Sequence, residues 1–283
     1  MLTPSAEKDL SNAPARAHTI SRKGAGAREP VPALELGAKY LSRLSARSAL
    51  YTDLRLLLAD LSEPLPVSDY RSLVVEQNRL ARTSAAGRGK IWTELKTRYL
   101  LDREAPLYRA FWSEWRRCSS EPERGLTAYV LLALNDRLVA DLGTQWLFPL
   151  LRRAPAELRV GEVLAFIRRT ATLHPEVQGW SNETRTAVAQ KYLASLRDFG
   201  LAQGKVKKVT VRPALYGAPA RLLVRALRLA GVRELELVQA PIFRLIGLDG
   251  LEVIEALGDL HRREELRFKM QGDVVEIGLE ARR

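Results

Sequence analysis

Hydrophobic residues recur at three- and four-residue intervals along most of the chain from Leu34 onward, and this spacing predicts a mainly helical protein. In the N-terminal half it predicts helices over residues 51–61, 67–78, 84–100, 107–117 and 126–142. Gly87 and Gly89 lie near the start of the third helix and weaken it by about 1 kcal/mol each relative to alanine. We therefore expect tertiary contacts or a ligand to hold its first turns.

The C-terminal half combines helices with short strands. Residues 160–170 have helical spacing, and Ser181 or Asn182 can cap a further helix that ends at Gly200. Its buried stripe consists of Val188, Tyr192, Leu196 and Phe199. After a turn at Gly204, the valines 206, 209 and 211 alternate with lysines, which favours a strand. A capped helix followed by such a hairpin predicts a winged-helix element, that is, a helix-turn-helix followed by a β-hairpin.

Prolines, glycines and local composition predict where the modules and connecting segments of the chain lie. Residues 1–33 mix Pro, Ala, Ser and Gly with charges of both signs, and we expect them to form a flexible tail. Pro149 and Pro155 flank a short stretch that suggests a junction between two helical modules, residues 34–154 and 155–283. A terminal β-hairpin is predicted by residues 266–270 and 274–279 around the turn Gln271-Gly272-Asp273.

Charge narrows the choice of partner. The 45 Lys and Arg residues exceed the 33 Asp and Glu residues, giving a net charge of +12 and a pI near 10.1, which favours polyanions. The single cysteine, Cys118, excludes an internal disulfide and a cysteine-based zinc site. No apolar run is long enough to span a membrane. These features predict a cytoplasmic protein.

Motifs for catalysis are missing from the sequence. The three histidines, His18, His174 and His261, are far apart and lack metal-ligand spacing. Neither a phosphate-binding loop nor a nucleophile elbow occurs, and Cys118 has no base nearby in sequence. We therefore expect no catalytic residues, no metal site and no cofactor.

Two basic clusters carry the candidate binding residues. The first spans twenty residues with one acid, Glu94, and consists of Arg79, Arg82, Arg88, Lys90, Lys96 and Arg98. The second straddles the capped helix and the lysine-rich strand, and consists of Arg185, Lys191, Lys205, Lys207, Lys208 and Arg212. Both suit phosphate contacts, although each could also be a solvated face. Within the second cluster, Arg185 and Lys191 are the candidates for groove contacts and the three lysines for flanking phosphates.

Several of these segments together resemble the BrxA family of bacterial BREX phage-defence systems. The resemblance covers residues 36–60, EQNRLARTSAAGRGKIWTELKTRYL, residues 126–142 and GWSNETRTAVAQKYLASLRDFGLAQGK. It rests on Glu76, Asn78 and Leu80 before a basic helix, and on Trp180-Ser181 before a helix that ends at Asp198-Phe199-Gly200-Leu201. It implies a mainly helical DNA-binding protein with winged-helix modules and no catalytic residues.

The leading hypothesis is a non-enzymatic accessory protein of a phage-exclusion system that binds double-stranded DNA and contacts other BREX proteins. The alternative is an adaptor whose basic faces dock onto acidic subunits of a defence complex. An RNA-binding role is disfavoured because no aromatic strand typical of RNA-recognition sheets is visible. An enzyme of unfamiliar type is the remaining alternative.

Overall fold

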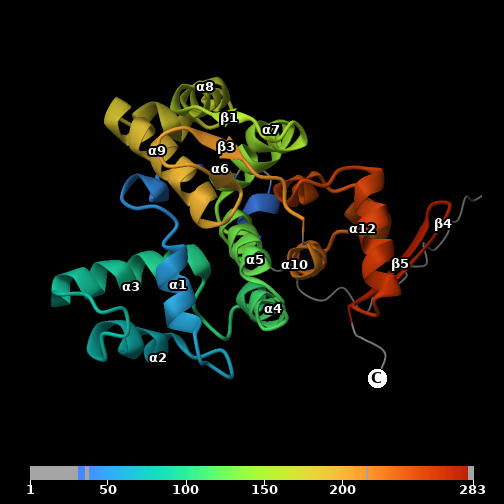
Figure 1. Ribbon diagram of the computed structural model, residues 1–283, viewed down its shortest axis with the longest axis horizontal. Coiled ribbons are helices and arrows are strands. Elements are labelled where there is room, and N and C mark those ends of the chain that lie inside the picture. The colour runs from blue at the N-terminus through green and yellow to red at the C-terminus, as the bar shows by residue number, and fades with distance from the viewer. Residues whose placement is uncertain (1–30, 36–37, 215, 280–283) are drawn as a thin grey trace, which may run out of the picture.

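The chain is built around the leucine-rich helix α5 (Glu121–Leu134), which is buried along nearly its whole length (Figure 1). The computed structural model describes residues 31–35, 38–214 and 216–279. Residues 1–30 of the expected tail lie outside the described residues. The expected tail also includes Val31 and Ala33, but these two side chains are buried at a short 3-10 turn, Pro32–Leu34.

The first four helices predicted for the N-terminal half are present with shifted ends. They are α1 (Tyr51–Leu58), α2 (Val67–Arg71) with a π-helical continuation at Ser72–Glu76, α3 (Ala85–Tyr99) and α4 (Pro106–Trp115). A second 3-10 turn, Arg43–Ser45, precedes α1. Ser84 caps α3 by accepting a hydrogen bond of 3.1 Å from the Gly87 amide. The side chain of Arg88 contributes a tertiary contact to its first turns, donating to the Val75 carbonyl at 2.7 Å.

The single helix expected over residues 126–142 is wrong, because the chain breaks at Asn135-Asp136. The Asp136 carboxylate accepts hydrogen bonds from the Leu138 and Val139 amides, at 3.0 and 3.3 Å, and so caps a new helix. The region therefore contains α5 and then α6 (Arg137–Asp141), which continues through a π-helical segment, Leu142–Leu147, into α7 (Phe148–Arg152).

The C-terminal half contains two small antiparallel sheets among helices. Its first part comprises β1 (Glu157–Leu158), α8 (Val160–Thr170), a 3-10 turn at Pro175–Gly179, α9 (Asn182–Asp198), β2 (Ala202–Gln203) and β3 (Lys208–Thr210). Its second part comprises α10 (Gly217–Leu229), α11 (Glu234–Val238), a 3-10 helix at Pro241–Ile246, α12 (Leu251–Arg262), β4 (Arg267–Gln271) and β5 (Val274–Gly278). The predicted terminal hairpin is confirmed, with Phe268 opposite Ile277.

Packing joins the two halves of the chain. α10 lies against both α4 and α5 (Figure 1). Buried side chains from residues 31–277 form one continuous hydrophobic core. The mainly helical fold with small antiparallel sheets is thus confirmed. The division into modules at residue 154 stays a prediction.

Candidate nucleic-acid interface

The second basic cluster lies in a region built from a strand, two helices and a hairpin. β1 precedes α8 and α9, and β2 and β3 follow them. The three strands form an antiparallel sheet in the order β1-β3-β2, in which Glu157 pairs with Val209 and Gln203 also pairs with Val209 from the other side. This order of elements is compatible with the winged-helix arrangement expected from the sequence.

Helix α9 is fixed at both ends, as its sequence predicted. The Ser181 hydroxyl accepts a hydrogen bond of 3.1 Å from the Thr184 amide. At the other end, the Leu201 amide donates to the Leu196 carbonyl and the Gly200 amide to that of Arg197, a Schellman motif that the positive φ of Gly200, 79°, permits. The buried face packs against α8, and the outward positions carry polar side chains, namely Asn182, Glu183, Gln190 and Arg197.

The loop between β2 and β3, residues 204–207, is the most exposed part of the hairpin and is termed the wing. Gly204 has a φ of 93°, and a Cβ there would collide with the Lys207 carbonyl. Lys205, Val206 and Lys207 are exposed, with Val206 at 94%. The expectation that Val206 belongs to the strand is therefore wrong, because the turn extends through Lys207 and the strand begins at Lys208.

Charges around the wing are positive and largely unopposed. The nearby carboxylate of Glu157 pairs with Arg159 at 2.8 Å, and this contact lowers the pKa of Glu157. Lys208 donates from Nζ to the Lys205 carbonyl at 3.2 Å, which helps to close the loop. Among the described residues, neither Lys205 nor Lys207 has an ion-pair partner. The wing can therefore offer two free ammonium groups to an anion.

The two arginines of the second cluster are engaged within the protein. Arg185 donates to the carbonyls of Val177 and Gln178, at 3.0 and 3.3 Å, and so holds the 3-10 turn against α9. Arg212 pairs with Glu252 of α12 at 3.1 Å. Lys191 is half-buried on α9. The expected contact of Arg185 with a DNA groove conflicts with these hydrogen bonds, because its guanidinium is already bound to the carbonyls of the 3-10 turn.

Most of the first cluster is likewise committed to internal contacts. Arg79 donates to the carbonyls of Leu56 and Ala59 at the end of α1. Arg82 pairs with Asp53. Lys90 and Lys96, in contrast, are exposed on α3, and they are the members of this cluster that remain available to a ligand.

Arg98 is the residue whose surroundings most clearly contradict the expected phosphate contact. Its side chain is 1% exposed, and Nη2 donates to the carbonyls of Arg43 and Arg47 at 2.8 and 3.1 Å and pairs with Glu94 at 3.0 Å. Burial lowers the pKa of Arg98, and the nearby carboxylate of Glu94 opposes that shift. A guanidinium in this position cannot reach a phosphate, so Arg98 supports the fold and is not a surface ligand.

Sequence reasoning missed two exposed arginines, Arg168 and Arg169, at the C-terminal end of α8. Arg169 lies over the ring of Phe166, 5.5 Å from its centroid. Both precede the turn into α9. The sequence did contain a signal for them: two adjacent arginines lie at the end of the helix predicted over residues 160–170, and the capped helix is the next predicted helix.

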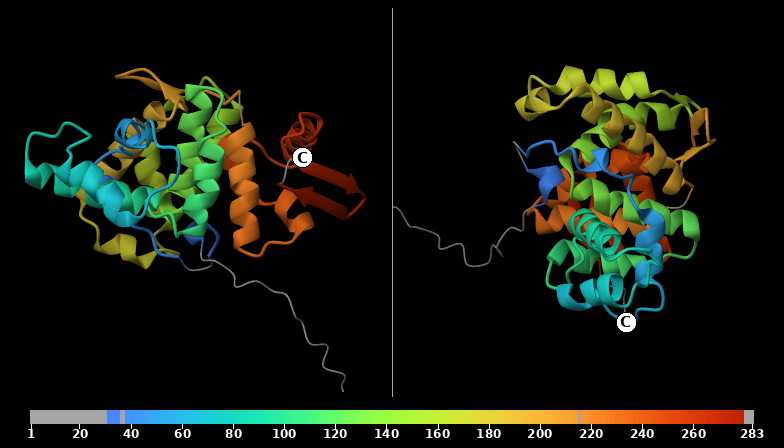
Figure 2. Two further views of the ribbon diagram at one scale, coloured as in Figure 1. Left: turned by 90° about the horizontal axis from the view of Figure 1, so that it is seen from below. Right: turned by 90° about the vertical axis from the view of Figure 1, so that its left-hand side faces the viewer.

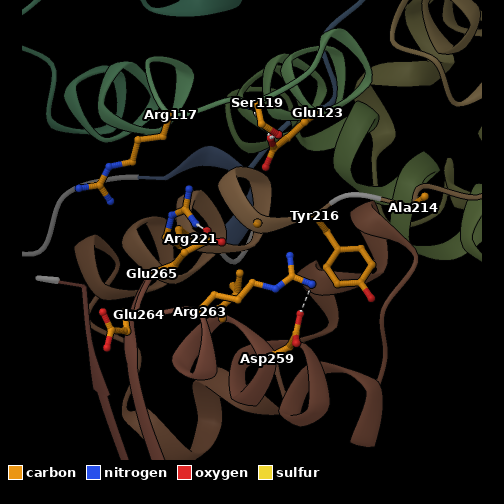
Figure 3. A pocket seen from close by; sticks show the side chains of 12 residues that line it. Arg117, Ser119, Glu123, Ala214, Tyr216, Arg221, Asp259, Arg263, Glu264 and Glu265 are labelled. Carbon is orange, nitrogen blue, oxygen red and sulfur yellow. Dashed lines mark hydrogen bonds and ion pairs between the residues drawn. The ribbon is translucent and has the colours of Figure 1, made fainter.

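A separate cavity of about 400 Å³ lies where the start of α5, α10 and the end of α12 meet (Figure 3). Four of the charged groups that line it form ion pairs: Arg263 pairs with Asp259 at 2.7 Å, and Arg221 pairs with Glu265 and, at 2.7 Å, with the buried Glu114. Burial favours a raised pKa for Glu123, but hydrogen bonds from Ala218 and Ser119 outweigh it and lower that pKa. The cavity is therefore a structural junction between the two halves.

Comparison with known families identifies the chain. The model of the BrxA family matches residues 38–224, which is most of the chain, and the protein belongs to this family. Membership makes it a component of a BREX phage-defence system. A comparison with curated proteins gave no match. Within the described ranges, each helix is too short or too polar to cross a bilayer.

Proposed function

We propose that this BrxA-family protein is a non-enzymatic accessory component of a BREX system that binds double-stranded DNA in the cytoplasm. The observation that carries the proposal is the placement of free lysines on the wing beside a capped helix with a polar outer face. Strand, helix pair and hairpin follow in the order that winged-helix proteins use to bring one helix to a groove and the hairpin to the adjacent backbone.

The contacts expected from these side chains are mainly electrostatic. Exposed lysines neutralise phosphates and release condensed counterions, so affinity falls steeply as salt rises. The exposed cations of the interface, which have no ion-pair partner among the residues that the structure describes, are Lys205 and Lys207 on the wing, Lys90 and Lys96 on α3, and Arg168 and Arg169 at the end of α8. Such contacts position the protein on the duplex and carry no base information.

Base contacts, if the helix enters the major groove, fall to α9. Since Arg185 is engaged by backbone carbonyls, the side chains with donor and acceptor groups at exposed positions are Asn182 and Gln190. Amide side chains of this kind pair with adenine through two hydrogen bonds. We therefore expect any sequence preference to respond to changes at Gln190 more than at Arg185.

An adaptor role is the alternative, and one feature of the surface favours it. A shallow groove of about 420 Å³ between α4 and α10 is lined by Arg109, Arg225 and Arg228 together with Leu229. Arg225 already pairs with Glu114 at 2.8 Å, whereas Arg109 is exposed. Charge complementarity would suit an acidic segment of another subunit there.

Titrating the purified protein against labelled duplex DNA at several salt concentrations separates the two proposals. DNA binding predicts measurable affinity at low salt and a linear fall of log affinity with log salt. Full-length protein that fails to bind duplex at low salt would contradict the DNA proposal and favour the adaptor.

A further inference from the structure

A basic segment lies between α3 and α9, the helices that carry parts of the two basic clusters. Residues 38–49, termed the strap, read AKYLSRLSARSA and contain three cations, three serines and no acid. Seen from the side in Figure 2, the blue strap runs between the yellow helices α8 and α9 above and the cyan helices below. It includes the 3-10 turn at Arg43–Ser45.

One end of the strap is anchored to the turn between α8 and α9. The Tyr40 ring stacks on His174, with centroids 3.5 Å apart, and the Tyr40 hydroxyl donates to Asp141 at 2.8 Å. The Tyr40 amide donates to the Glu176 carboxylate at 2.5 Å. These contacts fix the strap beside the helix pair.

Its other end is anchored to both α3 and α9. The Ala49 amide donates to the Ser195 hydroxyl of α9 at 2.8 Å, and Tyr99 of α3 donates from its hydroxyl to the Ala49 carbonyl at 2.7 Å. The buried Arg98 guanidinium holds two further strap carbonyls. Through these bonds α3, the strap and α9 form one hydrogen-bonded unit, so the lysines of α3 are held at a set distance from those of the wing.

The outward side chains of the strap match phosphate chemistry. Lys39 and Arg47 are exposed and have no ion-pair partner in the described part of the chain, whereas Arg43 is drawn inward and donates to the Asn135 carbonyl at 3.2 Å. Serine hydroxyls at positions 42, 45 and 48 are half-exposed between them. Cations and hydroxyls of this kind make most protein contacts to the DNA backbone.

We infer that the strap is a third contact to the phosphate backbone, made through Arg47 and Lys39, and that it joins α3 and the wing into one surface that binds a single duplex. The inference rests on the proposed DNA binding and deepens it. It predicts that one duplex binds per protein at saturation. The probe is a long duplex of about 30 base pairs, which is roughly three helical turns.

The double variant R47A/K39A is compared with the matched control R233A/K269A. The control removes two exposed cations from the C-terminal half, at the start of α11 and on β4. Both double variants therefore lower the net charge by the same amount. In fluorescence anisotropy against the long duplex, R47A/K39A should weaken binding and flatten the salt slope by about one unit for each lost phosphate contact. The control should leave the slope unchanged.

A further pair of measurements tests the single duplex. Adding K90A/K96A to R47A/K39A should flatten the slope further on the same long duplex, and a stoichiometric titration should saturate at one duplex per protein. If R47A/K39A matches the control, or two duplexes bind per protein, the inference falls while DNA binding stands. Wild-type protein that binds no duplex at low salt overturns the proposed function itself.

Discussion

The twelve basic residues proposed from the sequence as DNA contacts differ in their surroundings according to whether they are arginines or lysines. Arginines 79, 82, 88, 98, 185 and 212 all donate to a carbonyl or carboxylate within the protein. The lysines 90, 96, 205 and 207 stay exposed. A planar guanidinium with five donors satisfies several carbonyls at once, whereas an ammonium on a flexible chain is strongly hydrated and stays in solvent. A cluster of charges in the sequence therefore overstates how many of its arginines are available to bind DNA.

The structural role of Arg98 can be tested by substitution. Replacing it by Met keeps the apolar stem but removes the donors to Arg43 and Arg47, so we expect a loss of about 2–4 kcal/mol in the free energy of unfolding. The neighbouring exposed Lys96→Met should change stability by less than about 0.5 kcal/mol. Urea unfolding measures both. Equal stability of the two variants would mean that Arg98 does not support the fold.

At the scale of elements, the spacing of apolar residues predicted most helices, because one face of each is buried in the common core. Spacing also carried the signal for Arg98, which lies on the stripe of Ile91 and Leu95 at helical intervals. Periodicity did not reveal the break at Asp136, since apolar spacing continues across it and the cap is a local hydrogen bond. The tertiary partners of the arginines lie far away in sequence, and no local pattern contains them.

The conformation of the wing can be tested at Gly204. Gly204→Ala should strain the loop, because φ is positive and the added Cβ meets the Lys207 carbonyl, at a cost of about 1–3 kcal/mol. Gly161→Ala is the matched control, since a Cβ added at this position in α8 meets no neighbouring atom and should be neutral or slightly stabilising. Thermal unfolding compares the two variants. A Gly204→Ala protein that melts like Gly161→Ala would show that the wing adopts another conformation.

At the scale of the whole molecule, the exposed basic elements share one hydrogen-bonded support. α3, the strap and α9 are linked through Arg98, Tyr99 and Ser195, and the wing follows α9 directly. The ion-paired cavity of Figure 3 lies elsewhere, at the junction with α12. The surplus of positive charge in the composition is thus available to a polyanion through a few lysines and arginines rather than through the whole of each cluster.

The most direct test of DNA binding is the salt dependence of K205A/K207A against R233A/K269A, two variants with the same loss of charge. Both wing lysines are exposed and lack ion-pair partners among the described residues, so folding should be unaffected. Phosphate contacts from the wing predict weaker duplex binding for K205A/K207A, a slope flatter by about two units, and similar losses across DNA sequences. Affinity and slope equal to those of R233A/K269A would contradict DNA binding through the wing.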